Sequence, residues 1–389
     1  MRRVLLPLTL LWLAGAGLRL TVLAVPPVLP FIHADLNLSE TQVGILTGLP
    51  SLLFALAAVP GSLLIARVGA VTALALGLLL DGVASGLRGA APNALWLYAA
   101  TVAMGAGIAI AQPAMPPLVR AWQPDRIGFA TAVYTNGFLM GATAAAALSL
   151  PLVLPLVGGS WRLGFAAWAA PVVVTAVLVP LLAPRGGQRE SAVTVLGWWP
   201  DWRSPLLWRL GILFGSNNST YFTTNAFLSD YLNAHGAADL IGPALTALNV
   251  GQIPMSFALM AAAGRLQNRL WPYVVSGLGV LAGLAAVVFG TGVVIIAGAA
   301  FIGLSLTLSF VLILALPPLL SAPGDVHRMA AGMFSISYST AVLVPAVSGL
   351  LWDFTGVPGM AFAPTAVCGV LLAALAPRLP SGSGRHQEP

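Results

Sequence analysis

Long apolar runs alternate with short polar or Gly- and Pro-rich breaks along the whole chain. A helix needs about 20 predominantly apolar residues to cross a bilayer, and each of these runs approaches or exceeds that length. We therefore predict twelve membrane-spanning helices, at residues 5–31, 42–65, 71–90, 94–119, 129–156, 163–183, 206–232, 243–264, 272–291, 294–320, 329–352 and 359–377.

The longest polar break, at residues 184–204, falls at the midpoint of the chain and separates the first six predicted helices from the last six. We predict an all-α membrane protein built from two six-helix bundles. Residues 1–184 form the first bundle, residues 185–204 a cytoplasmic linker, and residues 205–389 the second bundle with a short cytoplasmic tail.

Composition agrees with a membrane setting, because 58% of the residues are hydrophobic and only 7% are charged, whereas about 25% are charged in soluble domains. A single cysteine excludes a disulfide framework. All 17 basic residues are arginine, so the chain has no lysine for an ATP-binding P-loop. Transport driven by ATP bound to this chain is therefore disfavoured.

Arginine placement predicts the orientation, since cytoplasmic loops of membrane proteins are enriched in basic residues. With the N-terminus inside, the outer side receives only Arg88 and Arg162. The inner side receives fourteen arginines: Arg2, Arg3, Arg67, Arg120, Arg126, Arg185, Arg189, Arg203, Arg209, Arg265, Arg269, Arg328, Arg378 and Arg385. We expect a multi-pass protein of a bacterial inner membrane with both termini cytoplasmic; the Ala-, Gly-, Pro- and Arg-rich composition suggests the bacterial source.

The two halves of the chain repeat short patterns at corresponding places. Pro116-Pro117-Leu118 closes the fourth predicted helix, and Pro317-Pro318-Leu319 closes the tenth. Such internal repeats are common in transporters, which bind substrate at the interface between the repeats. The repeat therefore predicts duplication of a six-helix unit, with a binding site between the halves.

Several stretches resemble known transporters. The twelve predicted helices, the midpoint linker and Gly159–Phe165 resemble the major facilitator superfamily. Leu18-Arg19, Gly44–Pro50 and Gly349–Gly356 are similar to the cyanate permease family, which includes members linked to nitroimidazole efflux. The resemblance implies an alternating-access transporter whose first, fourth, seventh and tenth helices line the pathway. It also implies cyanate-like substrates.

Arg19 lies near the middle of the first predicted helix. An arginine at the bilayer centre costs about 2.5–3.5 kcal/mol on an insertion scale, and such charges usually face a polar cavity or a functional site. No acidic residue lies within the same helix to neutralise it. We favour Arg19 as the anchor for an anionic or strongly polar substrate; the alternative is a buried arginine bonded to helix carbonyls.

Neutral polar residues inside the predicted helices are the other candidates for substrate binding. Each could instead bond a neighbouring helix. Asn218, Tyr221 and Asn225 are spaced three and four residues apart, hence on one helical face, and we favour that face. The full set of candidates beside Arg19 is Gln112, Tyr134, Asn136, Asn218, Tyr221, Asn225, Asn249, Gln252 and Tyr338.

Prolines inside three predicted helices suggest sites of bending, because proline removes a helix hydrogen bond. They are candidate gating hinges, with fixed kinks as the alternative: Pro26, Pro27, Pro116, Pro117, Pro317 and Pro318.

Asp81 is the clearest carboxylate inside a predicted helix. It could relay protons. Arg88 lies seven residues on, about two turns away on the same face, so we favour a structural polar contact for Asp81.

These features favour a secondary or facilitative transporter of a small anion or a small polar organic solute; that the anion is cyanate-like is what the resemblance implies. The alternative on the same fold is an exporter of drugs or nitro-heterocycles. A membrane-embedded enzyme or sensor is disfavoured, because the sequence has no His/Asp/Glu cluster and no Gly-x-Ser-x-Gly nucleophile motif. The four histidines show no metal-ligand spacing. We expect no cofactor, no metal and no nucleic acid; the partners are a small-molecule substrate and lipid, and the protein is a monomer.

Overall fold

The computed structural model describes residues 2–38, 40–184, 197–267 and 269–375. In these ranges the chain is helical and contains no β-strand. Ten helical stretches of the described residues are long and apolar enough to cross a membrane. Two further stretches fall short of that criterion: α11 (Pro205–Ala234) carries many polar residues, and Pro358–Ala374 is shorter. With these two, the described chain accounts for the twelve predicted helices.

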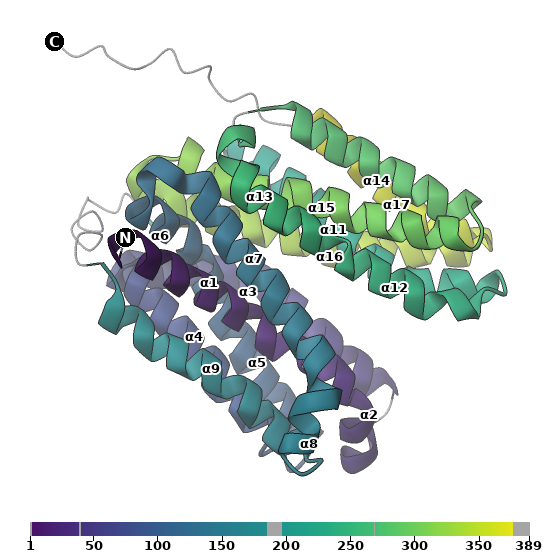
Figure 1. Ribbon diagram of the computed structural model, residues 1–389, viewed down its shortest axis with the longest axis horizontal. Helices are drawn as coiled ribbons and strands as arrows, with labels where there is room; N and C mark the ends of the chain where they lie inside the picture. Colours follow the sequence, from purple (N-terminus) through teal and green to yellow (C-terminus); the bar gives the residue numbers. More distant parts are fainter. Residues whose placement is uncertain (1, 39, 185–196, 268, 376–389) are drawn as a thin grey trace.

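The first half of the chain folds into one bundle, drawn from purple to blue-green in Figure 1. Its elements, in order, are α1 (Arg2–Leu23), α2 (Val25–Leu36), α3 (Glu40–Val68), α4 (Ala70–Arg88), α5 (Ala94–Ala111), η1 (Gln112–Ala114), α6 (Met115–Trp122), η2 (Pro124–Arg126), α7 (Ile127–Leu148), the π-helix η3 (Ser149–Val153), α8 (Leu154–Leu156) and α9 (Trp161–Leu182).

The second half folds into a separate bundle, drawn from green to yellow in Figure 1. After α11 its elements are η4 (Ala238–Leu240), α12 (Ile241–Val250), α13 (Gln252–Leu266), α14 (Trp271–Phe289), α15 (Val293–Leu320), η5 (Pro323–Asp325), α16 (Val326–Thr355), η6 (Pro358–Phe362) and α17 (Ala363–Ala374). Most of the predicted linker, residues 185–196, lies outside the described residues. The division into units 1–184 and 205–389 stays a prediction.

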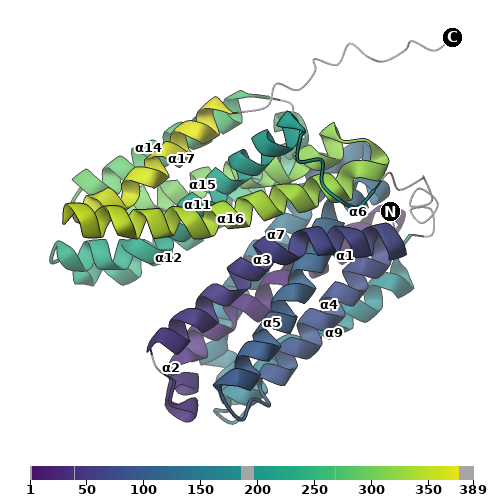
Figure 2. The same ribbon diagram turned by 180° about the vertical axis from the view of Figure 1, so that it is seen from behind.

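The two bundles meet at one end of the molecule and diverge toward the other (Figure 1). We call the end where α1 begins and α6 lies the proximal end, and the end that carries α2, α8 and the start of α12 the distal end. Figure 2, seen from behind, shows the same divergence, with α3 and α16 crossing near the proximal end. Helices α3 and α16 contact each other there, as do α7 and α13 on the opposite side.

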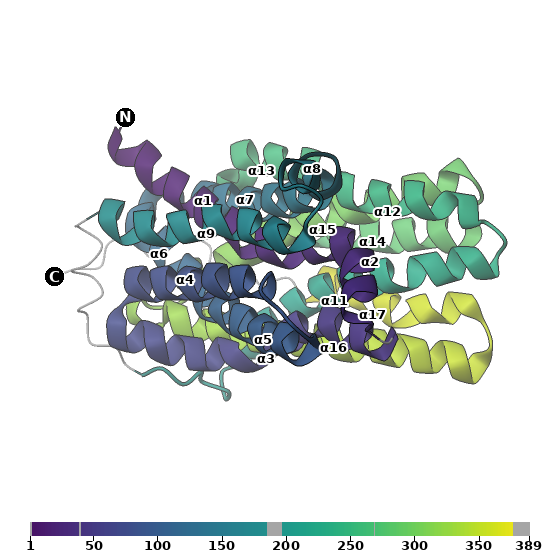
Figure 3. The same ribbon diagram turned by 90° about the horizontal axis from the view of Figure 1, so that it is seen from below.

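Within the first bundle, glycines allow two helices to approach closely. Gly137 and Gly141 of α7 have the four-residue spacing that lets membrane helices pack backbone to backbone. A Cβ added at Gly137 would lie 2.3 Å from the Trp12 carbonyl oxygen, and one at Gly141 would lie 2.3 Å from that of Ala16. This packing holds the second half of α1 against α7. Figure 3 shows α4 between α5 and α9 on another side of the bundle.

The predicted hinge prolines fall at two different kinds of place. Pro26 and Pro27 follow a break between α1 and α2 at Ala24. Pro116 and Pro117 begin α6 directly after the 3-10 turn η1. The counterparts Pro317 and Pro318 lie inside the last turns of α15, which continues to Leu320. A hinge role remains a prediction for all six prolines.

Candidate functional site

A cavity of about 320 Å³ lies between the two bundles. Residues from α1, α2, α3, α4, α5 and α7 line it on one side, and residues from α11, α13 and α15 line it on the other. Five of the ten predicted substrate-binding residues line this cavity: Arg19, Asn218, Tyr221, Asn225 and Gln252. Pro26, at the break between α1 and α2, lines it as well.

Arg19 connects the two bundles beside the cavity. Its Nη2 donates to the Tyr338 hydroxyl of α16 at 3.1 Å. The Gln112 amide of η1 bonds the same hydroxyl, with Nε2 donating to it at 3.1 Å. The Arg19 Cζ also lies 5.5 Å from the centroid of the Phe138 ring, within cation–π range. Arg19 is half-buried, so it can present part of its guanidinium to the cavity.

A second group of polar side chains lies on α11 and α12. The Tyr221 hydroxyl donates to Asn249 Oδ1 at 2.8 Å, and Asn249 Nδ2 donates to Asn225 Oδ1 at 3.2 Å. Asn218 Nδ2 donates to the Ser337 hydroxyl of α16 at 2.8 Å. The predicted face of α11 therefore reaches the cavity, and Asn249 supports it from α12 without lining the cavity itself.

Two of the predicted binding residues lie in the helix packing. Trp12 Nε1 donates to Asn136 Oδ1 at 2.9 Å, and Asn136 Nδ2 donates to the Ser256 hydroxyl at 2.7 Å. These bonds join α1, α7 and α13 and satisfy both ends of the amide. Tyr134 is fully buried with its ring edge against Phe138. Neither Tyr134 nor Asn136 lines the cavity, which agrees with the helix-bonding alternative for Asn136.

The aromatic part of the cavity wall was not predicted from the sequence. Phe54, Phe138, Phe222 and Phe310 line it from four different helices, and Asn217 joins the polar face of α11. Phenylalanine does not stand out within an apolar helix, so hydropathy gives no signal for these positions. Only the pairing of the bundles brings the rings together.

Asp81 and Arg88 are both buried inside the first bundle. Arg88 lies in the last turn of α4, within the predicted helix 71–90, and its side chain is buried rather than exposed on the outer side. Its Nη2 donates to the Thr21 carbonyl oxygen at 2.6 Å and to the Ser85 hydroxyl at 2.7 Å. Neither Asp81 carboxylate oxygen has a hydrogen-bond partner among the described residues. Arg88 and the Thr21 hydroxyl are nevertheless its electrostatic neighbours.

The proximal side of the cavity is closed by contacts between the bundles. Arg120 of α6 donates from Nη1 to the carbonyl oxygens of Pro318, at 2.9 Å, and of Ser321. These carbonyls lie at the C-terminal end of α15, which carries unpaired acceptors and partial negative charge. The Ser335 hydroxyl of α16 donates to the Ala55 carbonyl oxygen of α3 at 2.7 Å. The cavity lies on the distal side of these contacts.

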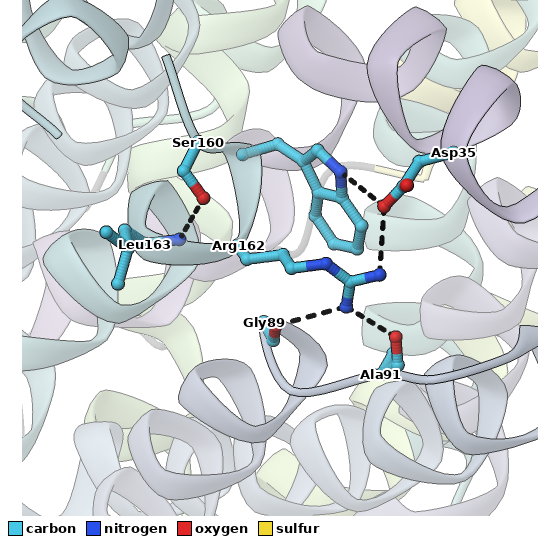
Figure 4. A network of polar contacts seen from close by, with 7 residues as sticks. Asp35, Gly89, Ala91, Ser160, Arg162 and Leu163 are labelled. Carbon is cyan, nitrogen blue, oxygen red and sulfur yellow. Dashed lines mark hydrogen bonds and ion pairs between the residues drawn. The ribbon is translucent and has the colours of Figure 1, made fainter. Parts of the chain in front are cut away.

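At the distal end, a polar network holds three segments of the first bundle together (Figure 4). Arg162 Nη2 lies 2.8 Å from Asp35 Oδ2, and its Nη1 donates to the Ala91 carbonyl oxygen at 2.5 Å. Trp161 Nε1 donates to the same Asp35 oxygen at 3.2 Å. The network joins the end of α2, the loop between α4 and α5, and the start of α9. It therefore fixes α2 to its own bundle.

Two helical bundles joined at one end, with a half-buried cation in the cavity between them, define a membrane transporter. The comparison with known proteins agrees. Residues 11–318 match the Major Facilitator Superfamily, and the chain belongs to this family.

Two curated relatives come from Escherichia coli (strain K12). The chain is 27% identical to the cyanate transport protein CynX over 365 residues, covering 93% of this chain and 94% of the relative. It is 26% identical to the 2-nitroimidazole transporter over 380 residues, covering 92% and 90%. The resemblance to the cyanate permease and nitroimidazole transporter family is thereby confirmed.

Among solved structures, the fold is similar to the Major Facilitator Superfamily transporter FucP in the outward conformation. The TM-score is 0.75 at 15% sequence identity, and the match covers 95% of this chain and 97% of that one. At this identity the likeness concerns the fold alone.

Proposed function

We propose that the protein is a secondary or facilitative transporter that moves a small anion or a small polar organic solute by alternating access, and that it is not an enzyme. One observation carries the proposal: Arg19, half-buried and bonded across the bundle interface, lines a cavity between two bundles that contact each other at the proximal end. A permanent charge with a planar fork of donors suits an oxyanion or carboxylate. Alternating access then requires the proximal contacts to break and distal contacts to form.

We infer that the proximal end faces the cytoplasm of a bacterium and the distal end the periplasm. The arginine count supports this: because Arg88 is buried, Arg162 at the start of α9 is the partly exposed member of the two arginines assigned to the outer side. Reporter fusions at residues 1, 195 and 389 should appear cytoplasmic, and fusions at 35, 235 and 355 periplasmic. A periplasmic reporter at 195 would contradict the six-plus-six arrangement.

A second candidate function is export of drugs or nitro-heterocycles. The aromatic wall of the cavity favours it, and one relative is a 2-nitroimidazole transporter. The difference from the first candidate lies in the charge of the solute. A neutral heterocycle would bind through the aromatic rings and amide side chains of the cavity, whereas an anion would bind through the charge of Arg19.

The two candidates separate in a thermal-shift screen of the purified protein, because a ligand that binds only the folded state raises the melting temperature. The screen compares small anions, cyanate among them, with neutral heterocycles, on the wild type and on Arg19→Gln. We expect anions to stabilise the wild type and to lose most of this effect in the variant. Stabilisation by neutral heterocycles alone, equal in both proteins, would support the exporter instead. A hit then enters a proteoliposome uptake assay.

A further inference from the structure

Aromatic rings approach Arg19 from both bundles. Phe138 of α7 lies 5.5 Å from the Arg19 Cζ, and its ring is 6.4 Å from that of Phe310 across the bundle interface. Tyr338 of the second bundle accepts the hydrogen bond from Arg19, and Phe54 of α3 packs edge-on against Tyr338 with 5.0 Å between centroids. The guanidinium therefore contacts aromatic side chains of α7 and α16, each of which packs against a further ring.

The cavity offers a solute one accessible positive charge, that of Arg19. Two arginines line it, but Arg88 is 1% exposed and donates to Thr21 and Ser85. Arg19 is half-buried and donates to Tyr338. Because a guanidinium has five N–H groups, it keeps further donors for a solute. Among the described residues that line the cavity there is no aspartate or glutamate. One accessible positive charge without an acidic partner suits a monoanion.

The volume sets the size of the solute. A cavity of about 320 Å³ lies at the small end of the range for organic ligands. A three-atom anion such as cyanate would occupy a small part of this space and leave the rings of Phe138, Phe222 and Phe310 facing water. A larger solute that covers this apolar surface binds more tightly than a small one. A flat ring that lies offset or edge-on to the cavity rings adds a further favourable contribution to the binding free energy.

We propose that the preferred solute is a ring-bearing organic monoanion, whose carboxylate binds Arg19 and whose planar ring lies against Phe138 and Phe310. This inference rests on the proposed function and narrows its substrate class. Such a solute matches a cavity that combines one cation with rings on several helices. A carboxylate attached directly to its ring would suit the short distance between Arg19 and Phe138.

Direct binding to the purified full-length protein tests this with five probes. Benzoate carries both features, cyclohexanecarboxylate keeps the charge with a puckered ring, and acetate and cyanate lack a ring. Benzyl alcohol keeps the ring without the charge. We expect benzoate to bind at least about tenfold more tightly than acetate, cyanate or benzyl alcohol, since burying a ring or pairing a carboxylate each contributes at least one decade in affinity.

Phe138→Leu tests the position of the ring, because leucine keeps the wall apolar and removes the flat face. The ratio of benzoate to cyclohexanecarboxylate affinity should fall by about two- to tenfold. Phe289→Leu is the matched control, since Phe289 is 85% exposed at the end of α14 and lies outside the cavity. If Phe138→Leu loses its thermal transition, Phe310→Leu tests the same wall from the second bundle.

The outcomes separate this inference from the function on which it rests. Acetate and cyanate binding as tightly as benzoate, with all three weakened by Arg19→Gln, would overturn the ring and leave the anion transporter intact. Equal binding of benzyl alcohol and benzoate would overturn the monoanion. Anion affinities that Arg19→Gln leaves unchanged would remove Arg19 from the site and overturn both proposals.

Discussion

The Arg19 guanidinium of α1 donates to the Tyr338 hydroxyl of α16 at 3.1 Å, joining residues 319 positions apart in the chain. One partner belongs to the first bundle and the other to the second. Any movement of the bundles that opens the proximal end must lengthen or re-aim this bond. A solute that binds Arg19 therefore acts on a residue that is bonded to both halves of the protein.

Arg19 should lose affinity for an anion in a graded way on substitution. Lysine keeps the charge and loses the planar fork, whereas glutamine loses the charge. A hydrogen bond to a charged group contributes about 1.5–3 kcal/mol, so Arg19→Gln should weaken binding by about ten- to a hundredfold. Arg19→Lys should fall between the two. Binding and melting temperature are measured on the same sample.

Folding should survive this change, because removing a charge from the membrane relieves an insertion cost. A purely structural Arg19 would show the opposite order of events: Arg19→Gln would lose melting temperature before it lost affinity.

Arg120→Gln should shift the protein away from the state with closed proximal contacts. The variant loses a charged donor to the C-terminal carbonyls of α15, and at about 1.5–3 kcal/mol the ratio of states should change by at least about tenfold. The readout is labelling of a cysteine at Ser51, which lines the cavity, by an impermeant reagent added from the distal side. Native Cys368 is buried.

We expect this labelling to slow in Arg120→Gln. Arg126→Gln is the control, because Arg126 is exposed on the next short helix, η2. Equal labelling rates in the two variants would show that the Arg120 bonds do not hold the closed end.

Asp81→Asn should leave solute binding nearly unchanged and should not lower the melting temperature. The Asp81 carboxylate is buried with no hydrogen-bond partner among the described residues, and an ionised group in that setting is costly. A neutral amide of similar size avoids the cost. Solute affinity and thermal unfolding are compared with Arg88→Gln, which removes the bonds to Thr21 and Ser85 and should destabilise the bundle. Lost solute binding in a stably folded Asp81→Asn would instead assign the carboxylate a part in transport.

Hydropathy predicted the helices well, because the bilayer requires long apolar stretches whatever their neighbours are. It also located the polar face of α11, since three- and four-residue spacing places Asn218, Tyr221 and Asn225 on one side of any helix. Arg88 shows the limit of this reasoning. Hydropathy placed this residue near the end of a predicted helix, but it could not show that the side chain is buried and bonded to Thr21 and Ser85.

The partners of the polar residues could not be predicted in the same way. Asn136 and Asn218 have the same side chain inside predicted helices, yet one bonds Trp12 and Ser256 within the packing and the other lines the cavity. What distinguishes them is which helix lies opposite. That depends on contacts between residues far apart in the sequence, as does the aromatic wall around Phe138.

The polar run of α11 has a consequence for how the protein enters the membrane. Alone, this helix would expose Asn217 and Asn218 to lipid, where unpaired amides are unfavourable. In the folded protein Asn217 donates to the Leu306 carbonyl oxygen of α15 at 2.8 Å, and Asn218 donates to Ser337 of α16. Both partners are synthesised later than α11.

We therefore expect α11 to insert incompletely by itself. Its insertion should become complete once α15 and α16 have been synthesised and have entered the membrane. Glycosylation mapping of α11 in microsomes, with and without the segment through α16, measures this. Full insertion of α11 on its own would contradict it. If α11 does wait for α15 and α16, the second bundle is completed only after its C-terminal helices have inserted. The polar wall that α11 contributes to the cavity would then be the last part of the pathway to form.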